Sequence, residues 1–83
     1  MKVEIESAIY VWDKGMSEMY VRLVNSLVLA HNEQDIRQKM EKLSAQSGFR
    51  DYFAYGYGRN HLWVKQLHPC GGVVESRLLI VRF

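Results

Sequence analysis

The sequence contains one cysteine, Cys70, and one proline, Pro69, among its 83 residues. A single cysteine cannot form a disulfide within the chain, which is typical of a reducing compartment. No run of about 18 apolar residues is present, and no basic start leads into an apolar segment. We therefore expect a cytoplasmic protein with no transmembrane helix, no secretory signal and no membrane partner.

The composition indicates one small globular domain spanning residues 1–83. Hydrophobic residues make up 48% of the chain and charged residues 24%. Disordered chains lack this apolar content, and a chain of this length has no room for a second typical domain. The six glycines and single proline exclude collagen-like and proline-rich classes.

The modest net charge of +2 hides an uneven distribution. Up to Asp35 there are six acidic and three basic residues, whereas from Ile36 onward there are eight basic and three acidic residues. The first part thus carries −3 and the remainder +5. Such asymmetry indicates either an acidic partner surface, a nucleic-acid surface, or dispersed solubilising charges.

The first segment predicts a strand, because β-branched and aromatic residues alternate with other types from Val3 to Trp12. Residues 13–15 then predict a three-residue turn. The segment from Met16 to His31 fits either a strand or a helix. We favour a second strand, since a hairpin register would place Glu6 opposite Arg22.

A helix is predicted from Glu33 to about Ser47. Asn32 suits the N-cap, with Asp35 three residues later in a variant of the capping box. Apolar residues recur at helical spacing through this segment. Gly48 fits the left-handed position that ends a helix.

Three strands are expected to follow. Residues 51–57 and 60–65 predict a hairpin with Gly58-Arg59 as its turn, which pairs Ala54 with Trp63. Residues 73–83 predict a central strand, because their consecutive apolar residues supply two covered faces. The fold class is therefore α+β in ββαβββ order: an antiparallel sheet with one amphipathic helix on one face.

One helix covers only one face of such a sheet, so the other face should be polar in a solitary monomer. The predicted strands instead give it Tyr10, Trp12, Tyr20, Val24, Val28 and Trp63. Exposed aromatic patches mark interaction sites. We therefore expect a protein partner or a homodimer to cover this face. The expected partner-binding residues are Tyr10, Trp12, Tyr20, Tyr52, Arg59, His61, Trp63 and Lys65.

A nucleic-acid-binding module is the main alternative. Five of the ten aromatic residues lie between Phe49 and Tyr57, and basic residues are interleaved with them. Single strands bind sheets through aromatic platforms flanked by cations. On this interpretation Trp63 and Tyr52 would stack on bases, and Arg59 and Lys65 would contact phosphates.

Catalysis is the weakest alternative. His61, His68 and Cys70 are the only set that suggests a nucleophile or a metal site. Their spacing matches no zinc pattern, and no orienting third group accompanies the thiol and imidazole. We expect no catalytic residues, cofactor, metal or small-molecule substrate.

The sequence thus favours a small non-enzymatic binding protein that uses an aromatic sheet face and the hairpin at residues 56–61. In general kind, such a domain resembles the compact inhibitors and modulators encoded by phages and mobile elements. That resemblance rests on size and on the lack of a catalytic constellation, and no motif supports it.

Overall fold

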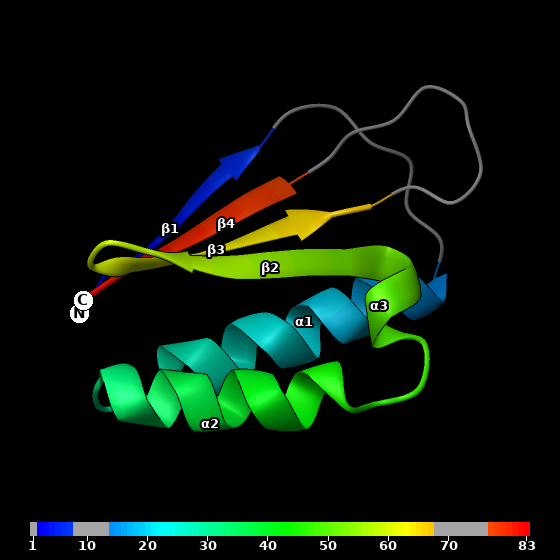
Figure 1. Cartoon of the computed structure of the whole chain (residues 1–83). Helices are drawn as coiled ribbons and strands as arrows, with labels where there is room; N and C mark the ends of the chain where they lie inside the picture. Colours follow the sequence, from blue (N-terminus) through cyan, green and yellow to red (C-terminus); the bar gives the residue numbers. More distant parts are fainter. Residues whose placement is uncertain (1, 8–13, 68–76) are drawn as a thin grey trace.

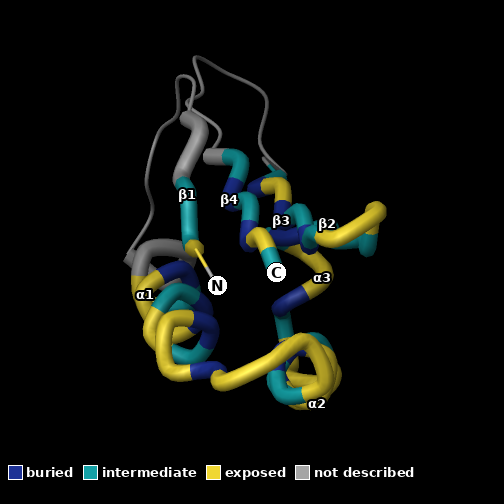
Figure 2. Tube along the Cα trace, turned by 90° about the vertical axis from the view of Figure 1, so that its left-hand side faces the viewer, coloured by how far each residue is buried: buried dark blue, intermediate teal, exposed yellow. Residues whose placement is uncertain are grey.

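The structure, a computed structural model, describes residues 2–7, 14–67 and 77–83. These residues form, in chain order, β1 (Lys2–Ser7), α1 (Lys14–Val28), α2 (Glu33–Ser44), α3 (Phe49–Tyr52), β2 (Phe53–Gly58), β3 (His61–Gln66) and β4 (Arg77–Arg82). The strands make one antiparallel sheet in the order β1-β4-β3-β2. Helices α1 and α2 lie side by side beneath one face of it (Figures 1 and 2). The predicted α+β class with an antiparallel sheet is confirmed.

The predicted ββαβββ order is wrong, because residues 14–28 form helix α1 and not a second strand. The residues that this helix buries follow helical spacing: Tyr20, Leu23 and Leu27. The alternation that favoured a strand was incidental. Strand β1 consequently pairs with β4, with Val3 opposite Val81, so the predicted pairing of Glu6 with Arg22 does not form.

Helix α2 begins as predicted. The Asn32 side chain accepts a hydrogen bond of 2.8 Å from the Asp35 amide, and the Asp35 carboxylate accepts one of 3.0 Å from the His31 amide. These bonds satisfy amides that a helix start leaves without partners. The helix ends at Ser44, three residues before the predicted end. Gly48 has the expected left-handed conformation, with a φ of 83°, but it does not end α2: Ala45 is the C-cap of α2, and Gly48 is the N-cap of α3.

The prediction of a central final strand is confirmed, since β4 lies between β1 and β3. Leu79 and Val81 are fully buried on the helix-covered side, and Leu78 and Ile80 are half-buried on the other. The consecutive apolar residues therefore do serve two faces of the sheet.

The second hairpin forms, but its turn is one residue later than predicted. Arg59 and Asn60 make the turn, Gly58 pairs with His61, and Trp63 lies opposite Gly56 instead of Ala54. Asn60 takes a φ of 63°, which asparagine tolerates better than most residues. Each predicted partner is displaced by two residues, so every side chain keeps its predicted face.

The core lies between the sheet and the two long helices. Its central members are fully buried: Leu23, Leu27, Ile36, Met40, Leu62, Leu79 and Val81. Gln66, at the end of β3, is the one polar residue buried among the described residues. Its side-chain amide has no hydrogen-bond partner there.

Candidate protein-binding surfaces

The sheet face that points away from α1 and α2 is the first candidate surface, which we call the open face. No helix of the described part of the chain covers it (Figures 1 and 2). Register and alternation place on it Lys2, Glu4, Ala54, Gly56, Gly58, His61, Trp63, Lys65, Leu78, Ile80 and Arg82. Its apolar centre consists of Trp63, Ile80 and Leu78, all half-buried.

The Trp63 side chain lies flat along this face over the neighbouring strand. A Cβ atom on Gly56 would come within 2.6 Å of Trp63 Cζ2. The His61 ring covers Gly58 in the same way. His61 Nδ1 is also held 3.0 Å from the Arg59 carbonyl oxygen. The glycines of β2 therefore leave room for two rings that extend the surface toward the edge of the sheet.

The charges of the open face are arranged around Glu4. Its carboxylate lies 3.0 Å from Lys2 Nζ and 3.2 Å from Arg82 Nε. Hydrogen bonds from Lys2 and Arg82 lower the pKa of this carboxyl below its ordinary value, and the bond from Lys2 has the larger effect. Lys65 is exposed and makes no ion pair with the described residues. Lys65 is thus the cation of this face that is free to meet a partner's carboxylate.

The structure brings only part of the predicted binding set together. Trp63, His61 and Lys65 share the open face, and Arg59 lies at the adjoining hairpin turn. Tyr20 is 6% exposed in the core, so its assignment to a binding face is wrong. Tyr52 belongs to α3 and packs against the core, so its assignment beside Trp63 is also wrong. Tyr10 and Trp12 lie outside the described residues.

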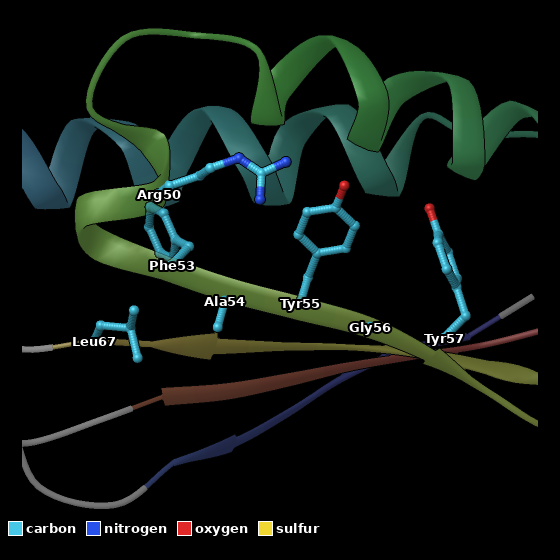
Figure 3. A pocket seen from close by; sticks show the side chains of 7 residues that line it. All are labelled: Arg50, Phe53, Ala54, Tyr55, Gly56, Tyr57 and Leu67. Atoms are coloured by element: carbon cyan, nitrogen blue, oxygen red, sulfur yellow. The ribbon is translucent and has the colours of Figure 1, made fainter.

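A second candidate surface is a pocket of about 470 Å³ along β2, which we call the β2 groove. Residues of β2 and α3, together with the residue that follows β3, line it: Arg50, Phe53, Ala54, Tyr55, Gly56, Tyr57 and Leu67. Figure 3 shows the Tyr55 and Tyr57 hydroxyls pointing toward the helices, with the Arg50 side chain extending along the same side. The groove therefore combines two phenol rings with one guanidinium.

Helix α2 holds the two tyrosines of this groove in place. The Tyr55 hydroxyl lies 3.3 Å from Ser44 Oγ. The Arg37 guanidinium lies 4.0 Å from the centre of the Tyr57 ring and also pairs with Glu33 at 3.1 Å. Burial raises the pKa of the Tyr57 phenol most, and the nearby Tyr55 raises it further. The positive charge of Arg37 partly opposes that rise. The Tyr57 phenol therefore stays neutral at physiological pH. Arg37 is already engaged with Glu33 and with the Tyr57 ring.

Comparison with known proteins assigns nearly the whole chain to one family. The profile of a family described as Domain of unknown function (DUF8466) matches residues 1–81. The chain belongs to the DUF8466 family. No curated protein and no solved structure matches it.

This DUF8466 domain also has apolar surface that the sequence interpretation missed. Val21 in the middle of α1, Val28 at its end and Leu29 just after it are 53%, 56% and 68% exposed. The predicted strand places Val28 on the second face of the sheet, whereas the structure places it at the end of helix α1. Helical periodicity through residues 20–30 was the signal that could have located them correctly.

The described residues of the DUF8466 domain hold no cluster of three histidine, cysteine or acidic side chains suited to a metal ion. His61 is engaged with the hairpin backbone. The other two members of the predicted nucleophile or metal set, His68 and Cys70, lie outside the described residues. Across residues 2–7, 14–67 and 77–83, no helix has the length and apolar character to cross a bilayer.

Proposed function

We propose that this chain is a non-enzymatic binding domain that recognises another protein through its open face. The observation that carries the proposal is the position of Trp63. Its indole is half-buried, spreads over Gly56, and borders Ile80 on a face that the described helices leave uncovered. Tryptophan in such a setting is the residue type most enriched among binding hot spots.

The polar groups around Trp63 suit a protein partner. Lys65 and His61 flank the tryptophan along β3, and Glu4 with its two cations lies across the face on β1 and β4. An apolar centre with charged groups at its margin is the usual anatomy of an interface. The partner should therefore supply an apolar contact for Trp63 and a carboxylate for Lys65.

A nucleic-acid platform has less support. Tyr52 is not beside Trp63, which removes one of the two rings assigned to base stacking. Two of the cations on the open face already contact Glu4. Lys65 and the nearby Arg59 are the remaining positive groups there among the described residues. A steep loss of affinity with added salt would nevertheless favour nucleic acid over protein.

The test is a capture experiment from the native host with three forms of the full chain. These are the wild type, Trp63→Ala, and Gln38→Ala as a control on the exposed surface of α2. We expect a protein to be retained by the wild type and the control and lost with Trp63→Ala. Equal retention by all three forms would contradict the open face as the site.

The mass of the free chain, measured by sedimentation, completes that experiment. A monomer that binds a different protein supports a heterologous partner. A dimer that Trp63→Ala dissociates would show that a second copy covers the open face. A folded Trp63→Ala chain is required in either case, and circular dichroism checks this.

A further inference from the structure

The free edge of β2 is unusual because nothing in the strand blocks another strand from joining it. Among the described residues, strand β2 ends the sheet order β1-β4-β3-β2. Its sequence, Phe-Ala-Tyr-Gly-Tyr-Gly, has no charge and no proline. Proteins usually protect edge strands with such residues. The opposite edge, β1, carries the charged residues Lys2 and Glu4 and is protected in this way.

The register identifies which backbone groups point outward from β2. The Leu67 amide donates a hydrogen bond to the Tyr52 carbonyl, with N and O 2.6 Å apart. Hydrogen-bonded and non-bonded pairs alternate along an antiparallel ladder. Ala54, Gly56 and Gly58 therefore direct their amide and carbonyl groups toward β3. Tyr55 and Tyr57 direct theirs toward the free edge.

The β2 groove runs beside this edge and supplies a charged anchor. Arg50 is exposed, and no described carboxylate lies within 4.0 Å of its guanidinium. Arg37, on the α2 side of the groove, is already paired with Glu33 and stacked on Tyr57. An arginine without a partner, next to unpaired backbone groups, suits a carboxylate carried by an extended chain.

We propose that the β2 edge binds an extended acidic segment of a partner protein as a fifth strand, with one carboxylate of that segment on Arg50. The backbone groups of Tyr55 and Tyr57 form the new ladder, in the manner of β-strand addition. The groups that make this site are the outward backbone groups of Tyr55 and Tyr57 and the Arg50 guanidinium, and none of these three residues belongs to the open face. Strand β2 of a second copy is a poorer occupant, because it contains no carboxylate for Arg50.

The test uses a library of random twelve-residue peptides displayed on phage and selected on the immobilised full chain. We expect the selected peptides to contain aspartate or glutamate and to lack proline in the bound stretch. Selection on Arg50→Glu should instead enrich lysine and arginine. The proposal would be overturned if the wild type did not enrich acidic peptides. It would also be overturned if the wild type and Arg50→Glu enriched the same peptides.

Four variants then locate the site with one selected peptide made synthetically. Arg50→Glu should weaken its affinity about tenfold or more, as expected for loss of a charge-assisted hydrogen bond. The matched charge reversal Arg22→Glu, on α1, should leave affinity within about twofold of the wild type. Tyr57→Pro removes an outward amide and should abolish binding, whereas Tyr57→Ala keeps that amide and should retain it.

Two further readouts keep the result interpretable. If Tyr57→Pro fails to fold, protection of the Tyr55 and Tyr57 amides from hydrogen exchange in the peptide complex replaces it. Unprotected amides would overturn the proposal.

A peptide affinity that Trp63→Ala leaves unchanged supports a site separate from the open face. A free chain that self-associates through Arg50 would show that a second copy occupies the edge, and would also overturn the proposal.

Discussion

The indole of Trp63 occupies the space that a side chain at Gly56 would fill. A Cβ atom at position 56 would lie 2.6 Å from Trp63 Cζ2 and 2.9 Å from Cε2. The two residues face each other directly across β2 and β3. The tryptophan on the open face therefore depends on the absence of a side chain on the next strand.

Gly56→Ala should lower the free energy of unfolding by about 1–3 kcal/mol, because the added methyl group must displace the indole. In a Trp63→Ala background, Gly56→Ala should leave the free energy of unfolding almost unchanged or raise it, since alanine restricts the unfolded chain more than glycine. Urea unfolding of the four proteins of this double-mutant cycle measures the difference. Equal costs in both backgrounds would show that the two residues are not in contact.

Gln66→Leu should raise the free energy of unfolding by about 1–2 kcal/mol. Gln66 is 1% exposed and its amide has no partner among the described residues, so an apolar side chain of similar size avoids a desolvation cost. The exposed neighbour Lys65 provides the control, and Lys65→Leu should change stability by less than about 0.5 kcal/mol. A loss of stability in Gln66→Leu would mean that the amide is hydrogen-bonded in solution.

Asn32→Ala should lower the free energy of unfolding by about 1 kcal/mol, because it removes the acceptor for the Asp35 amide. Asn32→Asp keeps that acceptor and should be nearly neutral. Gln34→Ala, at an exposed position in the first turn of α2, serves as the control. Thermal or urea unfolding checks all three, and a neutral Asn32→Ala would contradict the capping role.

Glu4 should titrate below the ordinary glutamate value of 4.5, because Lys2 and Arg82 stabilise its carboxylate. A pKa lowered in the folded state gives stability that is present above the unfolded pKa and is lost as pH falls through the folded one. NMR titration should show a higher Glu4 pKa in Lys2→Gln and in Arg82→Gln, with Lys2 having the larger effect. An unchanged pKa in both variants would contradict these contacts.

Sequence reasoning succeeded where one local pattern dominated. Four features follow from short-range chemistry: the Asn32 cap, the left-handed conformation of Gly48, the hairpin of β2 and β3, and the central position of β4. The faces of β2 and β3 were also predicted correctly, because a shift of two residues preserves side-chain alternation. Trp63 could therefore be assigned to the open face from the sequence alone.

Sequence reasoning failed where two periods fitted equally well. Residues 16–31 satisfy both alternation and helical spacing, and the decision depends on what Leu23 and Leu27 pack against. That information lies in tertiary contacts, which override weak local propensity. Because the segment was predicted as a strand, Tyr20 was assigned to a surface although it lies in the core. The β2 groove could not be predicted, since it requires α3, the sheet edge at β2 and Leu67 to be placed together.

The affinity of Trp63→Ala for the captured protein partner is the most direct test of the proposed function. Isothermal titration calorimetry should give a Kd at least about 30-fold weaker than that of the wild type, as expected for the loss of a hot-spot tryptophan. The circular dichroism spectrum should remain that of the folded domain. A folded Trp63→Ala chain that binds within about twofold of the wild type would show that the open face is not the binding surface.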